Sequence, residues 1–163
     1  MSARKPIKIA DDDEKWYRHI LSPSEVLVAK DAPTKLHYKF FEKRFGCPSS
    51  PAWQHEISGR LVSRAGSIED AAAVALERVA SKKKAFHGVI CASAGDIRNV
   101  EPKCFDVKHT PFSFDSGHAD LISRRRFEMT DEMVPTHEFD DLRELLRLIP
   151  LDDPSFPKGG DGC

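Results

Sequence analysis

The sequence predicts an α+β domain: a small sheet with a central β-α-β unit, an alanine-rich helix packed on it, and an amphipathic helix near the C-terminus. Three observations predict this fold. Residues 56–63 and 86–92 have the composition of strands, an alanine stripe with helical spacing lies between them, and a second helical stripe occupies residues 137–148. The chain has 163 residues, 40% hydrophobic and 31% charged, which suits one globular domain.

Both ends of the chain have the composition of solvated tails. Residues 1–15 combine a basic cluster with Asp11, Asp12, Asp13 and Glu14 and carry almost nothing to bury. Residues 151–163 are rich in proline and glycine. We therefore predict a single domain over residues 16–150 between two disordered tails.

The region before residue 46 has two ambiguous segments. Residues 25–29 form a short apolar run that suits a strand or a short helix, and we favour a helix or turn. Residues 34–45 fit a helical face through Leu36, Phe40, Phe41 and Phe45, but Leu36 and Phe40 also fit strand alternation. The sequence leaves helix and strand open there.

The central unit has clearer signals. Ser67 can cap a helix over residues 67–84, with acidic residues in its first turn and lysines at its end. The continuous apolar run 86–92 is typical of a strand buried on both faces, as in parallel sheets. Together with the strand at 56–63 this predicts a right-handed β-α-β crossover.

Two more strands and a helix follow. Asp96 is placed to cap a short turn, and residues 104–109 and 118–122 alternate as strands. The helix at 137–148 carries its apolar stripe at Phe139, Leu142, Leu146 and Ile149 and ends before Pro150.

Candidate catalytic residues gather around the strand at 118–122. His118 and Asp120 lie on one face of it, so the carboxylate can orient the imidazole as a general base. Arg98 or Arg18 would then stabilise developing negative charge. His109 is a further candidate, but alternation places it on the apolar face of its strand, away from His118. The alternative is an ordinary polar face of an edge strand.

No metal or cofactor is expected. Cys91, Cys104, His109 and His118 are separated by 13, 5 and 9 residues, which matches no compact zinc signature. The four cysteines have no paired close spacing, and we expect reduced thiols.

Binding surfaces are predicted at two places. Asp96 follows a buried strand, where ligand crevices form in α/β folds, and Arg124, Arg125 and Arg126 form a cationic run. Solvated charge is the alternative explanation of this run.

The overall composition narrows the range of partners. The net charge of −1 gives no support for nucleic-acid binding, so we expect another protein as partner. The chain has no apolar stretch near the roughly 20 residues that span a bilayer and no signal-like N-terminus, which predicts a cytoplasmic protein without membrane contact.

Several short motifs resemble a loose group of small bacterial α/β proteins to which no activity is attached. They are the aromatic-Arg step at residues 16–20, Gly88-Val89-Ile90 followed by Ala94-Gly95-Asp96-Ile97-Arg98, and Pro111 before Gly117-His118-Ala119-Asp120-Leu121. The resemblance implies that Arg18, Arg98 and His118 belong to one surface. By analogy it also implies a component of a bacterial multigene system, such as a defence or toxin system.

Two functions follow from these residues. The first is a non-catalytic component that binds a partner or ligand. The alternative is a small hydrolase or nucleic-acid-processing enzyme that uses His118 and Asp120 with Arg98 or Arg18. Whether the chain is an enzyme, and its oligomeric state, are left open by the sequence.

Overall fold

The structure is a computed structural model that describes residues 8–21, 25–30, 32–37, 40–45, 56–65, 87–111, 116–125, 127, 136–150 and 152–157. Within these ranges the protein is an α+β fold dominated by strands. None of the described helices is long and apolar enough to cross a membrane.

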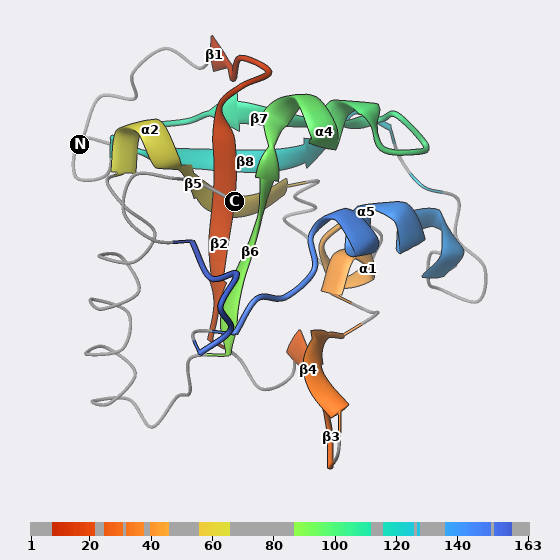
Figure 1. Cartoon of the computed structure of the whole chain (residues 1–163). Helices are drawn as coiled ribbons and strands as arrows, with labels where there is room; N and C mark the ends of the chain where they lie inside the picture. Colours follow the sequence, from red (N-terminus) through yellow and green to blue (C-terminus); the bar gives the residue numbers. More distant parts are fainter. Residues whose placement is uncertain are drawn as a thin grey trace.

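A six-stranded sheet forms the centre of the molecule (Figure 1). Its order is β1 (Lys8–Ile9), β7 (Phe105–His109), β8 (His118–Ser123), β5 (Glu56–Leu61), β2 (Lys15–Ile20) and β6 (Gly88–Ser93). Neighbouring strands are antiparallel throughout this order. In Figure 1, β2 and β6 run steeply past β5, β7 and β8, which lie across the view, so the sheet turns sharply between β5 and β2.

The strands predicted at 56–63, 86–92, 104–109 and 118–122 are confirmed as β5, β6, β7 and β8, with ends that differ by at most two residues. β5 stops at Leu61, because Val62 begins the short helix α2 (Val62–Ala65). In β5, β7 and β8, alternation directs one set of apolar side chains to the same core. Ile57, Leu61, Val107 and Leu121 all lie in the main hydrophobic core.

The central crossover differs from its prediction. β5 and β6 are both antiparallel to β2, so they run in the same direction, but β2 lies between them. β6 is therefore an edge strand of an antiparallel sheet and not half of a parallel pair. It is buried on both faces because Ile90 and Ala92 join the main core while Val89 and Cys91 join a second cluster with Tyr17. The predicted helix at 67–84 lies outside the described residues.

Aromatic side chains from two helical segments cover the core face of the sheet. α1 (Phe40–Phe45) provides Phe41 and Phe45, and η2 (Thr136–Phe139), which leads directly into α5 (Asp140–Leu145), provides Phe139. The Phe45 and Phe139 ring centroids lie 6.0 Å apart, and both rings contact Phe105 of β7. The four stripe residues of the predicted helix at 137–148 are all buried, although only residues 140–145 are α-helical.

A separate hairpin forms a two-stranded sheet of its own, which lies below α1 in Figure 1. It consists of β3 (Val26–Ala29) and β4 (Ala32–Leu36). The preference for a helix or turn at residues 25–29 is therefore wrong, because the apolar run pairs as a strand. Both readings of residues 34–45 are partly right, since β4 ends at Leu36 and α1 begins at Phe40.

The N-terminal segment differs from the predicted tail from residue 8 onward. β1 pairs with β7, and the buried Ala10 donates its N–H to Val107 O at 3.0 Å. The following turn accepts the N–H groups that begin α4 (Ala94–Asn99), through Ala94 N to Glu14 O and Gly95 N to Asp12 O. The carbonyls of this turn thus satisfy donors that a helix leaves open.

The C-terminal segment also packs against the sheet, and it differs from the predicted tail at Phe156. Ile149 exchanges two backbone hydrogen bonds with Val89 and so covers part of the outer edge of β6. Phe156 is buried in the second cluster. Gly88 permits this contact, because it has φ +137° and a Cβ there would lie 2.4 Å from Ile149 O.

Candidate functional site

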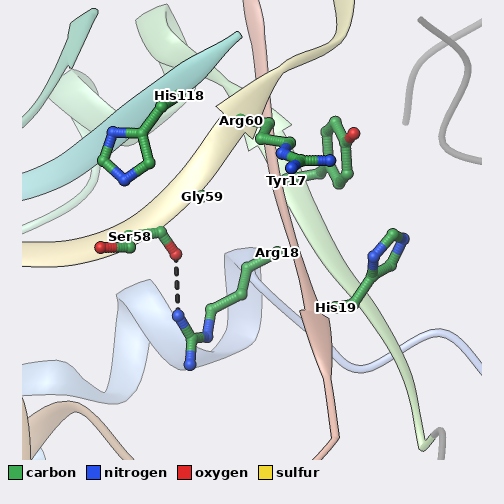
Figure 2. A pocket seen from close by; sticks show the side chains of 7 residues that line it. All are labelled: Tyr17, Arg18, His19, Ser58, Gly59, Arg60 and His118. Atoms are coloured by element: carbon green, nitrogen blue, oxygen red, sulfur yellow. Dashed lines mark hydrogen bonds between the residues drawn. The ribbon is translucent and has the colours of Figure 1, made fainter. Parts of the chain in front are cut away.

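A small cavity lies where β2 and β5 separate. The two strands pair only at Trp16 with Leu61 and Tyr17 with Arg60. Beyond these pairs a hollow of about 240 Å³ opens between β2, β5 and β8. Its described lining residues, all drawn in Figure 2, are Tyr17, Arg18, His19, Ser58, Gly59, Arg60 and His118. We call this hollow the Arg18 pocket.

Gly59 and Trp16 fix the position of this junction. A Cβ on Gly59 would lie 2.4 Å from Trp16 Cε2 and 2.5 Å from Tyr17 O. The missing side chain lets the Trp16 indole cross β5, and Trp16 Nε1 donates to Ala119 O of β8 at 3.1 Å. Trp16 is fully buried. One glycine therefore allows β2 to lie tightly on β5 just before the strands separate.

Arg18 spans the gap between the separated strands. Its Nη1 donates to Ser58 O at 2.9 Å (Figure 2). Its Nη2 lies 3.8 Å from Glu25 Oε1, and its buried Nε has no hydrogen-bond partner within the described ranges. Burial lowers the pKa of Arg18, and nearby Arg44 lowers it further, while Glu25 acts in the opposite direction. The charge on Arg18 is therefore only partly compensated.

His118 and Asp120 share a face of β8 as predicted, and Thr110 connects them. Thr110 Oγ1 donates to Asp120 Oδ2 at 2.9 Å and lies 2.8 Å from His118 Nδ1. Since this hydroxyl gives its one proton to the carboxylate, it accepts from Nδ1, as does Thr110 O at 3.1 Å. The contacts therefore place a proton on Nδ1. The direct His118 Nε2 to Asp120 Oδ1 distance is 3.9 Å, too long for a hydrogen bond.

His109 lies apart from His118. It is paired with Ala119 across β7 and β8 and so lies on the other face of the sheet, as alternation predicted. Its Nε2 is 2.7 Å from Ser116 O. His109 is not among the residues that line the Arg18 pocket.

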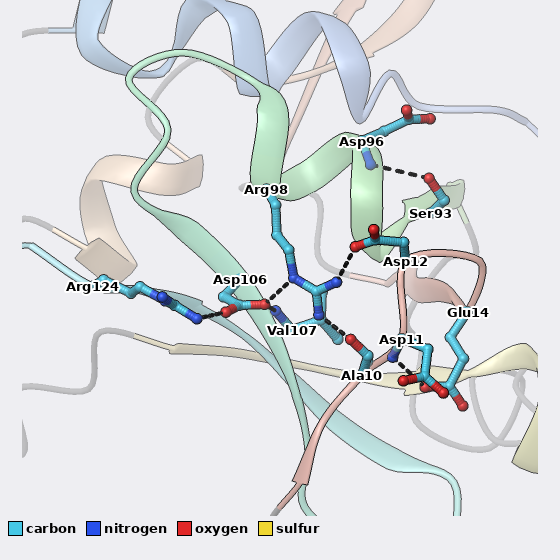
Figure 3. Close-up of polar contacts among 10 residues, drawn as sticks. All are labelled: Ala10, Asp11, Asp12, Glu14, Ser93, Asp96, Arg98, Asp106, Val107 and Arg124. Carbon is cyan, nitrogen blue, oxygen red and sulfur yellow. Dashed lines mark hydrogen bonds and ion pairs between the residues drawn. The ribbon is translucent and has the colours of Figure 1, made fainter.

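Arg98 belongs to a second polar cluster, shown in Figure 3. Its Nε donates to Asp106 Oδ1 at 2.7 Å, and its other nitrogens contact Asp12 and Ala10 O. Arg124 contacts the second oxygen of Asp106. We call these residues the Asp106 cluster. The implied common surface of Arg18, Arg98 and His118 thus forms only in part, because Arg98 does not reach the Arg18 pocket.

Opposite charges are closely matched in the Asp106 cluster. Asp106 is fully buried, which by itself raises the pKa of its carboxyl. Hydrogen bonds from Arg98, Val107 N–H and Arg124 outweigh this effect and hold the pKa below its usual value. Burial likewise lowers the pKa of Arg98, but its bonds to Asp106 and Asp12 raise it overall. These contacts explain Arg98 and Arg124 as structural residues.

The remaining predicted binding residues do not gather at one place. Asp96 is exposed, and its N–H bonds to Ser93 Oγ, so Ser93 and not Asp96 caps α4. Arg125 pairs with Glu138 at 2.9 Å. Arg126 lies outside the described residues.

Metal-ligating residues do not cluster in the described part of the chain, where no group of three or more is placed to hold an ion. Cys91 is disulfide-bonded, so the prediction of reduced thiols is wrong for this residue. Cys104 is a buried free thiol, and burial raises its pKa.

A larger groove of about 710 Å³ lies between β4 and α5. Its charged lining residues are Lys35, Asp140, Arg143, Glu144, Arg147 and Asp153. Three are cationic and three are anionic, so this groove favours neither sign of ligand charge.

The sequence pointed to Arg18 and His118 but missed the β5 wall of the pocket. The sequence contained one signal for this wall, Gly59 within an otherwise regular strand pattern. A glycine inside a strand often marks a close approach of another backbone. Comparisons of the chain with known protein families, curated protein sequences and solved structures find no match.

Proposed function

We propose that the chain is a non-catalytic binding component whose ligand or partner places an anionic group in the Arg18 pocket. The observation that carries this proposal is the partly compensated charge of Arg18. The Arg18 side chain is about one-quarter exposed, at 27%, and it lines a hollow whose described lining includes Arg60 but no carboxylate. Guanidinium groups bind carboxylate and phosphate oxygens strongly where water is partly excluded.

The pocket is suited to a small group. A hollow of about 240 Å³ is smaller than the sites of drug-sized ligands. We therefore propose that a phosphate or carboxylate group of a larger ligand or protein partner enters it. A role in a bacterial defence or toxin system is also proposed, and it rests on the resemblance of the short motifs alone.

The test is a titration with inorganic phosphate and with acetate, followed by backbone amide NMR shifts. We expect saturable shifts at Arg18, Ser58 and Gly59, with a dissociation constant on the order of 1 mM. Arg18→Met should abolish them. Arg143→Met is the matched control, because Arg143 also donates to a backbone carbonyl, Leu36 O, but lies outside the Arg18 pocket. Unsaturable shifts, or equal losses in both variants, would overturn the proposal.

A small hydrolase is the second candidate, and the Thr110 contacts favour it. A proton on Nδ1 is the arrangement that leaves Nε2 as the basic nitrogen of a neutral imidazole. In Figure 2 this nitrogen points toward Ser58. Against this candidate, Arg98 and His109 lie elsewhere. If the protein hydrolyses p-nitrophenyl phosphate or p-nitrophenyl acetate, and His118→Ala does not, the hydrolase would replace the binding proposal.

A further inference from the structure

Glu25 lies between two arginines that compete for one of its oxygens. Arg44 Nη2 is in direct contact with Glu25 Oε1, and Arg18 Nη2 lies 3.8 Å from the same atom. The Glu25 side chain is only 11% exposed, so water contributes little to its neutralisation. One carboxylate is thus shared unequally between two guanidinium groups.

Arg44 is fixed in place by its own helix. Its Nη1 donates to Phe40 O at 3.1 Å, and its guanidinium carbon lies 4.0 Å from the centre of the Phe40 ring. Phe40 is buried in the main core. Arg44 therefore holds Glu25 from a rigid support, because the contacts with Phe40 restrict its rotamers.

We infer that Arg44 and Glu25 are positioning residues that set how much of the charge on Arg18 is available to an anion in the Arg18 pocket. Arg44 holds the carboxylate and so keeps it from closing on Arg18. The inference rests on the proposed function, since it concerns the same pocket. It adds a connection from the pocket, through Glu25 before β3, to helix α1.

The two partners have opposite expected effects. Without Arg44, Glu25 is released to pair with Arg18, and the pocket loses affinity for anions. Without the Glu25 carboxylate, Arg18 loses its nearby counter-charge, and anion affinity rises. The directions agree with the influence of the two residues on the pKa of Arg18, which Arg44 lowers and Glu25 raises.

The experiment compares phosphate binding by the wild type, Arg44→Met, Glu25→Gln and the double variant. We expect Arg44→Met to weaken binding and Glu25→Gln to tighten it, each by up to about fivefold, the size of one partly exposed ion pair. Both single variants break the same ion pair, so both should be destabilised. Destabilisation alone would shift the two affinities in the same direction.

The double variant separates a relayed effect from a general change in charge. If Arg44 acts through Glu25, Arg44→Met should change affinity by less than about twofold in the Glu25→Gln background. Arg143→Met, which removes a positive charge elsewhere, should also have little effect. Shifts in the same direction, additive shifts, or an equal effect of Arg143→Met would overturn this inference and leave the proposed function intact. If the wild type binds neither phosphate nor acetate, both are overturned.

Discussion

The Asp106 cluster and the Arg18 pocket contain the same types of residue in opposite balance. In the Asp106 cluster, Arg98 and Arg124 contact a fully buried carboxylate, and Arg98 also contacts Asp12. Beside the Arg18 pocket, Arg18 and Arg44 share Glu25, and Arg18 is the more distant partner. In the first arrangement the charged side chains connect α4, β7 and the N-terminal segment and so stabilise the fold. In the second, Arg18 is only partly compensated, and this is the basis of the proposed anion binding.

Asp106→Asn should have the largest effect on stability. The change removes the charge that two guanidinium groups contact and leaves both without their buried partner. Breaking a buried ion pair costs about 3 kcal/mol. Urea unfolding should show this loss, while phosphate binding by the folded variant should equal that of the wild type. A loss of binding with unchanged stability would contradict the division of roles between the two regions.

Lowering the pH should gradually remove the stability that the Asp106 carboxylate provides. Because the folded-state pKa of Asp106 is lowered, its stabilisation is complete above the unfolded pKa of about 4 and is lost as the pH falls through the folded value. The difference in unfolding free energy between the wild type and Asp106→Asn should therefore shrink below about pH 4. Asp153 also has a lowered pKa, because of its bonds to Ser155. Since it is present in both proteins, its contribution cancels in the difference between their unfolding free energies. A difference that stays constant down to pH 2 would contradict this assignment.

Gly59→Ala should affect the Arg18 pocket and leave the Asp106 cluster intact. The new methyl group would overlap the Trp16 ring and Tyr17 O, and neither can move freely, because the indole is buried and hydrogen-bonded. Overpacking of this kind costs about 2 kcal/mol. We expect lower stability in urea together with weaker phosphate binding, since the strands that carry Arg18 and Ser58 must shift.

A matched change elsewhere provides the control for Gly59→Ala. Gly95→Ala places a methyl group 3.1 Å from Asp12, beside the Asp106 cluster, and lies outside the Arg18 pocket. It should leave phosphate affinity unchanged. If Gly95→Ala weakened binding as much as Gly59→Ala, the effect would reflect general destabilisation.

Local patterns predicted the strands and the faces of their side chains. Alternation alone placed His118 with Asp120 and separated both from His109, because a strand's period fixes which side chains share a face. Contacts distant in sequence could not be predicted. The two residues of β1 are too few for a period, so the partners of Arg98 at Ala10 and Asp12 had no signal.

The Arg18 pocket also depends on contacts between residues distant in the sequence, which local patterns could not predict. Arg18 and His118 are 100 residues apart, and they meet because β2 inserts between β5 and β6. The sequence predicted β5 and β6 as neighbours, since the apolar run in β6 resembles a parallel strand. Its burial instead comes from a core on each face. Strand order depends on the whole chain, and it decides which polar residues share a pocket.

His118→Ala should have the smallest effect on stability, within about 1 kcal/mol. The imidazole is partly exposed, and its contacts with Thr110 are the outer half of a network whose inner half, Thr110 to Asp120, does not require it. Thr110→Val is the informative comparison, because it removes the donor to the buried Asp120 and should cost about 1 to 3 kcal/mol. Urea unfolding of both variants would test whether Thr110→Val is more destabilising than His118→Ala. If His118→Ala were the more destabilising change, His118 would hold the sheet together as the residues of the Asp106 cluster do, and its role in the Arg18 pocket would need another explanation.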